Sequence, residues 1–150
     1  MKRMVVFFLV IGLLIGASFL VKNDFSPFLN FNRLVIVSSK PLTYRTFLIQ
    51  NGSDFYYEFD KNQLEVAIND KDNIKSYIFY YDNNLTKEDF NQYFDFIYQG
   101  NISEQNYTIY YGYYSGYSDY EIISGKKVNF QLVQTSTQWI LGFPMIMTGF

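Results

Sequence analysis

Paired carboxylates are the candidates for general acid–base chemistry in this sequence, because its 150 residues include neither histidine, the commonest general base, nor cysteine. Glu58 and Asp60 share one face of a predicted strand, and such a pair could in principle hydrolyse a glycoside. Asp119 and Glu121 have the same spacing. Paired carboxylates on a strand more commonly form only its solvated face, so the sequence favours a protein that is not an enzyme.

No cofactor or metal site is predicted. The missing cysteine and histidine remove thiolate and imidazole ligands. Oxygen-bearing side chains alternate in NDKDN, residues 69–73, but a glycine and a distal glutamate are lacking, so a hairpin turn is favoured over a calcium loop. GYYSG, residues 112–116, has no Lys-Ser/Thr pair and does not indicate a phosphate loop.

Tyrosine dominates the segment YTIYYGYYSGYSDY, residues 107–120. A tyrosine buries its ring and keeps its hydroxyl in water, which suits a half-exposed sheet face. Tyr and Trp are also frequent anchors of protein interfaces, so a protein partner or self-association is the favoured function. The alternative is a cell-wall glycan that stacks on the rings. The predicted binding residues are Tyr110, Tyr113, Tyr114, Tyr117 and Trp139.

A period of two from Arg33 onward predicts that strands carry these residues. The expected strands of the first half are RLVIVSS, TYRTFLIQ, DFYYEFD, QLEVAIN and IKSYIFYYD, with a hairpin turn at Asn51-Gly52. Those of the second half are NYTIYYGYY, YSDYEIIS, KKVNFQLVQTS and the apolar run from Gln138. In KKVNFQLVQTS, the residues expected to face inward are Val128, Phe130 and Leu132, and those expected to face outward are Lys127, Asn129 and Gln131.

Between the two sets of strands the apolar period becomes helical. Thr86 is a suitable N-cap, Asp89 follows at the capping-box spacing, and Gly100 suits the C-terminal cap. The expected fold is therefore α+β: a curved antiparallel sheet (meander, helix, meander) with one main helix, about 86–99, packed on one face. One helix does not cover such a sheet, so we expect the opposite face to be wet or to meet a partner.

The N-terminus predicts export. Lys2 and Arg3 precede an uncharged run, Met4 to Val21, which is either a signal peptide or a membrane anchor. The expected divisions are residues 1–22 as signal or anchor, 23–32 as linker and 33–150 as a single α+β domain. That domain is expected at the extracellular face of the cytoplasmic membrane or secreted, with residues 4–21 in the membrane if uncleaved.

Charge argues against nucleic acid as a partner. Residues 23–150 hold nine basic and 14 acidic side chains, a formal charge of −5. Binding to nucleic acid depends largely on neutralising phosphates, which this balance opposes. The absence of cysteine, together with the many Phe, Tyr, Ile, Asn and Lys residues, is typical of a Gram-positive bacterium.

Two stretches of the C-terminal third are distinctive: Val128-Asn129-Phe130-Gln131 and Leu141-Gly142-Phe143-Pro144-Met145-Ile146. In these stretches the chain resembles the YwmB-like exported proteins of Gram-positive bacteria, over residues 86–150 at most, plus the export signal. The resemblance implies a TATA-box-binding-protein-like fold, a curved antiparallel sheet with helices on its convex side, without the DNA function. It implies no catalytic residues. The chain departs from the family in showing no helix before the first set of strands.

Overall fold

The structure, a computed structural model, describes residues 31–42, 47–59 and 73–146. Several predictions lie outside these residues: the N-terminal signal or anchor, the linker up to residue 30, the strand QLEVAIN and Asp60. No helix in the part of the chain that is described is long and apolar enough to cross a membrane.

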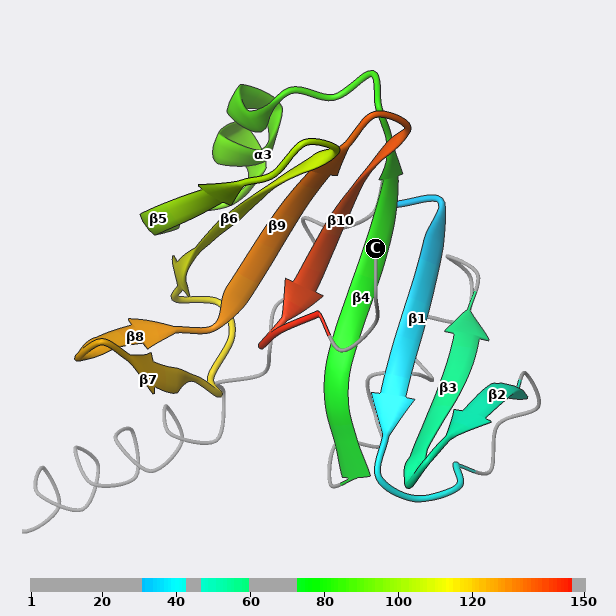
Figure 1. The fold of residues 1–150 in the computed structure, drawn as a ribbon. Helices are drawn as coiled ribbons and strands as arrows, with labels where there is room; N and C mark the ends of the chain where they lie inside the picture. The colour runs from blue at the N-terminus through cyan, green and yellow to red at the C-terminus, as the bar shows by residue number, and fades with distance from the viewer. Residues whose placement is uncertain (1–30, 43–46, 60–72, 147–150) are drawn as a thin grey trace, which may run out of the picture.

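Eight strands form one antiparallel sheet, in the order β2-β3-β1-β4-β10-β9-β6-β5 (Figure 1). Its strands are β1 (Arg33–Ser38), β2 (Phe47–Asn51), β3 (Asp54–Phe59), β4 (Ile74–Asp82), β5 (Phe96–Ser103), β6 (Tyr107–Tyr114), β9 (Phe130–Thr135) and β10 (Gln138–Phe143). A separate two-stranded hairpin contains β7 (Glu121–Ile123) and β8 (Lys126–Val128). The predicted antiparallel sheet with one described helix is therefore confirmed.

The sheet consists of two sequence-contiguous halves. Strands β1 to β4 form one half and β5, β6, β9 and β10 form the other. The second half is a meander interrupted by the β7–β8 hairpin, whereas in the first half β3 lies between β2 and β1 and is not in simple meander order. The halves join where β4 pairs with β10, from Asp82↔Gln138 to Tyr77↔Phe143.

The helix α3 (Lys87–Tyr93) begins as predicted and ends much earlier. Thr86 accepts a hydrogen bond from the Asp89 N–H, and the Asp89 carboxylate accepts one from the Thr86 N–H, so the capping box is present. The predicted extent to residue 99 is wrong, because β5 begins at Phe96. The sequence from residue 94 fits the two-residue period of a strand as well as the period of a helix. As a strand, it pairs its backbone hydrogen-bonding groups with those of β6.

Glycine forms two of the turns. The predicted hairpin between β2 and β3 is present, but Asn51 pairs with Asp54, so the turn residues are Gly52 and Ser53 rather than Asn51 and Gly52. Gly52 has φ +60°, a conformation that glycine adopts without strain. The turn between β7 and β8 has positive φ at both central residues, Ser124 and Gly125, as a type I′ turn requires.

Both faces of the sheet contain buried apolar residues. On the first face, Phe90 and Phe94 from α3 and its end pack against strand residues such as Tyr81 and Trp139. The second face buries a smaller cluster that includes Val37, Ile78, Val133 and Ile140. The expectation that the face opposite the helix would be wet or partner-bound is therefore wrong over its centre.

The segment after β10 crosses this second face. The Ser76 hydroxyl donates to the carbonyl of Met145, and the Ile146 N–H donates to Oε1 of Gln131 at 3.1 Å. A Cβ at Gly142 would collide with the Ile146 side chain. Glycine at this position therefore allows the chain to fold back closely over β10.

Candidate functional site

Three of the five predicted binding residues lie inside the protein. Tyr114, Tyr117 and Trp139 are 7%, 3% and 1% exposed. The Trp139 indole N–H donates to the carbonyl of Leu85 at 2.9 Å, and the Tyr117 ring lies 5.2 Å from that of Phe143. These rings form core contacts in the described structure, and a ligand would have to displace those contacts to stack on them.

Tyr110 belongs to a half-buried cation–aromatic cluster. Its ring stacks on Trp139 at 6.3 Å, and Nζ of Lys87 lies 4.8 Å from it and 4.3 Å from the Tyr98 ring. Burial is the main cause that raises the pKa of Tyr98, and the neighbouring Tyr110 and Glu88 add to it. The lysine therefore already occupies ring surface that a sugar would need.

Asn129 is a buried polar residue that the alternation placed on the outside, and that prediction is wrong. It is fully buried, its amide donates to the carbonyls of Tyr114 and Tyr117 at 2.8 Å each, and its oxygen accepts from the Tyr114 N–H at 2.7 Å. Asn129 thus holds the turn that follows β6. The sequence signal that could have indicated this buried position was an asparagine between two apolar residues.

Tyr113 lies on the second face, beside the edge strand β5. It pairs with Ile97, which is 60% exposed, and further along the same two strands Ile102, 53% exposed, pairs with Ile109. Directly opposite residues in antiparallel strands project to the same face. Ile97 and Tyr113 are therefore side by side, as are Ile102 and Ile109.

A bulge in β5 brings these two pairs to one face. The register shifts between Tyr98 and Gly100. Without the extra residue, Ile97 and Ile102 would project to opposite faces, because side chains alternate along a strand. Tyr111, opposite Gly100, also projects to this face. We call the resulting set the β5 patch: Ile97, Ile102, Ile109, Tyr111 and Tyr113.

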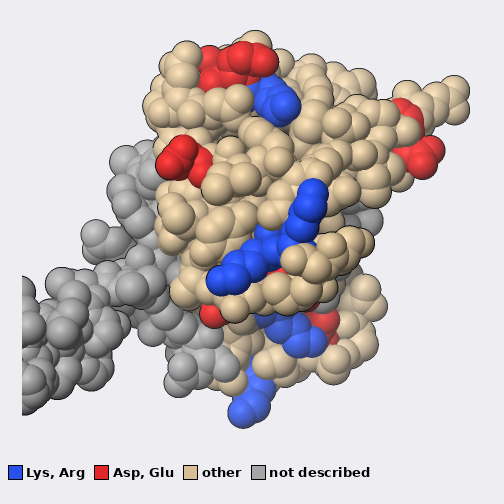
Figure 2. All heavy atoms as spheres, turned by 90° about the vertical axis from the view of Figure 1, so that its left-hand side faces the viewer, with Lys and Arg blue, Asp and Glu red and all other residues tan. Residues whose placement is uncertain are grey.

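The outer edge of β5 is the end of the sheet, and no described element lies beyond it (Figure 1). Every second residue of an edge strand directs its N–H and C=O away from the sheet. Strand β5, FIYQGNIS, contains no charged residue and no proline. Figure 2 shows that uncharged residues cover most of this side of the molecule, with a band of Lys or Arg side chains across its middle.

The β7–β8 hairpin has further exposed apolar side chains, Ile122 and Ile123, and Nζ of Lys127 lies 4.3 Å from the ring centre of Tyr120.

Acidic residues lie at both ends of the β5 edge. Asp95 directly precedes β5 and Glu104 directly follows it, and both are exposed. The edge is thus an uncharged strand with an acidic residue at each end.

The carboxylates considered for catalysis are not assembled into a site by the described residues. Glu58 is half-buried on β3, its predicted partner Asp60 lies outside the described residues, and Asp119 and Glu121 are both exposed. No group of three or more Asp or Glu residues with metal-binding geometry occurs within residues 31–42, 47–59 and 73–146.

Comparison of the chain with protein-family models, with curated proteins and with solved structures finds no match.

Proposed function

We propose that this chain is an exported, non-enzymatic domain that binds an extended segment of another protein by strand addition at β5. The export part rests on the basic start and the apolar run from Met4 to Val21. The YwmB-like resemblance belongs to the same proposal, although the fold of that family has more than one helix and the structure describes only one. Burial of Tyr114, Tyr117 and Trp139 argues against the alternative, glycan binding at the predicted tyrosines.

One observation carries the binding proposal: the edge strand β5 is eight residues long, is uncharged and contains two exposed isoleucines. Proteins usually protect such an edge with lysine, proline, a bulge or a very short strand, because unpaired backbone groups recruit another strand. Of these features β5 has only the bulge, and the bulge also places Ile97 and Ile102 on the same face. Recognition by strand addition takes its affinity from backbone hydrogen bonds and its specificity from alternate side chains.

The flanking charges favour a different protein over a second copy of this chain. If two copies of β5 paired antiparallel about their centres, Asp95 of one would lie opposite Glu104 of the other, at both ends of the ladder. Like charges directly opposite destabilise a pair of strands. A partner strand with lysine or arginine at its ends would turn both contacts into attractions.

Designed peptides test the proposal directly. The probe is a labelled ten-residue peptide of alternating valine and threonine with a lysine at each end, titrated with the full chain in detergent and followed by fluorescence anisotropy. Exposed ion pairs contribute roughly 0.2–1 kcal/mol each, so exchanging both lysines for glutamate should weaken binding about tenfold. A central proline should abolish binding, because it removes an N–H and breaks the extended pairing.

Matched substitutions identify the edge. Ile97→Lys should abolish binding of the lysine peptide, whereas Ile49→Lys should leave it unchanged, because Ile49 is similarly exposed on β2 at the opposite edge. Equal affinity for the lysine and glutamate peptides, or equal loss in both variants, would refute strand addition at β5. Concentration-dependent dimerisation that Ile97→Lys removes would instead identify a second copy as the occupant.

A further inference from the structure

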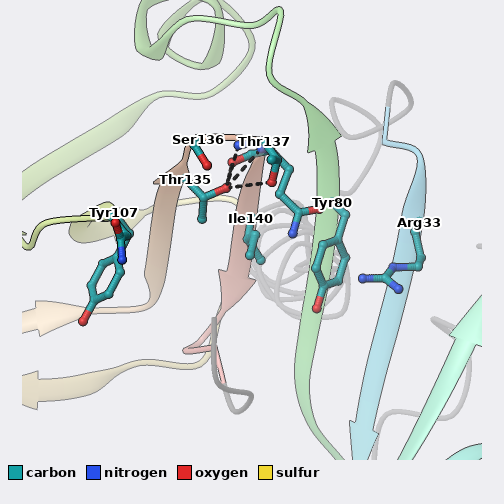
Figure 3. Close-up of a pocket in the computed structure, with 9 residues that line it drawn as sticks. Arg33, Tyr80, Tyr107, Thr135, Ser136, Thr137 and Ile140 are labelled. Carbon is teal, nitrogen blue, oxygen red and sulfur yellow. Dashed lines mark hydrogen bonds between the residues drawn. The ribbon is translucent and has the colours of Figure 1, made fainter.

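A polar cavity lies on the second face of the sheet. Its volume is about 350 Å³, at the lower end of the range for small-molecule sites. Figure 3 shows Tyr107 on one side, Tyr80 and Arg33 on the other, and Ile140 between them, with the β9–β10 turn above. The cavity therefore spans strands from both halves of the sheet and has room for a ligand of one or two rings.

Arg33 provides the charge in this cavity. Its guanidinium carbon lies 4.0 Å from the centre of the Tyr80 ring, so stacking holds the group in place. Among the described residues it forms no ion pair. Asp82 is on the same face of β4, two residues from Tyr80, but its carboxylate accepts a hydrogen bond from the Asn32 amide instead. A guanidinium fixed in this way can bind a carboxylate through two parallel hydrogen bonds.

The other lining groups are neutral. Asn106, Ser136, Thr137 and Gln138 contribute amides and hydroxyls, whereas the Thr135 hydroxyl is used within the turn, where it donates to the carbonyl of Gln138 at 2.9 Å. Among the described residues, neither an acidic residue nor a lysine lines the cavity. A ligand with several phosphates would need more than one cation, and an amine would need a carboxylate.

We propose that this cavity binds an acidic sugar, a saccharide unit that bears one carboxylate. Arg33 pairs with the carboxylate, and the neutral amides and hydroxyls bond to the sugar hydroxyls. The Tyr107 ring, with Ile140, contacts the apolar surface of the sugar ring, whereas the Tyr80 ring holds the Arg33 guanidinium. This site uses none of the five residues predicted from the sequence and does not depend on strand addition at β5.

A pair of glycosides that differ only in the carboxylate tests this assignment. Methyl glucuronide and methyl glucoside are titrated into the full chain in detergent, and binding is followed by ligand-observed NMR. We expect the glucuronide to bind about tenfold more tightly, the effect of one charge-assisted contact at a partly exposed site. Equal binding of the two glycosides, or no binding of the glucuronide below about 10 mM, would overturn the proposal.

Variants of Arg33 separate charge from geometry. Arg33→Gln should remove the preference for the glucuronide, and Arg33→Lys should retain only part of it, because lysine lacks the planar fork. Lys40→Gln is the matched control, since it removes an exposed positive charge just beyond the other end of β1. A thermal melt of each variant confirms folding. If Lys40→Gln reduces the preference as much as Arg33→Gln does, a general charge effect replaces the proposed site.

Discussion

Replacement of Asn129 by leucine should destabilise the protein strongly, although the two side chains are similar in size. Asn129 is fully buried and makes three hydrogen bonds to the backbone of Tyr114 and Tyr117, at 2.7 to 2.8 Å. A hydrogen bond contributes about 1 kcal/mol net, so the loss of three predicts about 3 kcal/mol. Typical domains have a free energy of unfolding of about 5–15 kcal/mol, so this loss is a large fraction of the total.

Urea denaturation followed by tryptophan fluorescence measures this loss. Trp139 is the only tryptophan and is buried, so its emission reports unfolding without a label. Asn91→Leu is the control, because Asn91 is exposed on α3 and its replacement should change the unfolding free energy by at most about 0.5 kcal/mol. A loss below about 1 kcal/mol for Asn129→Leu, or one equal to the control, would refute the proposed role of Asn129.

Three further predictions concern the sheet and the helix cap. Trp139→Phe should cost about 1–3 kcal/mol, because it removes the hydrogen bond to the Leu85 carbonyl and leaves space behind; circular dichroism in urea measures it. Gly112→Ala should cost about 1–3 kcal/mol and speed hydrogen exchange in β5, because the added Cβ collides with the carbonyl of Ile97; unchanged exchange would contradict this. The pKa of Asp89 is lowered by hydrogen bonds from the N-cap backbone and then the N-cap side chain, so its carboxylate stabilises the fold above its usual pKa, and the stabilisation is lost as pH falls through the lowered value. Asp89→Asn should therefore reduce Tm at pH 7 but not at about pH 2, and an equal reduction at both would exclude the charge as the cause.

Local signals in the sequence predicted local structure well. The capping box at Thr86 and Asp89 and the hairpin near Asn51 depend on a few adjacent residues, and both are present. The helix end was wrong because Phe94, Phe96 and Tyr98 fit a strand as well as a helix. Their rings pack on the core, with the Phe96 ring stacked 4.1 Å from that of Phe130 on β9. This contact joins residues far apart in the sequence, and it favours the strand.

The candidate sites could not be predicted from alternation alone. The β5 patch depends on a bulge that changes the face on which Ile102 lies, and the pairing register of β5 with β6 fixes that bulge. Similarly, Asn129 has the position of an outward residue, but the turn after β6 gives its amide three backbone partners inside. The cavity around Arg33 joins residues from five strands and their connections, which become neighbours only through the strand order.

The pairing of β4 with β10 has a consequence for how the chain matures. The central ladder of the sheet requires a strand from the first half and the last described strand of the second, so ribosomal synthesis delivers its two sides far apart in time. Until β10 is synthesised, the backbone groups of β4 that pair with it lack that strand partner, and this side of β4 is a sheet edge.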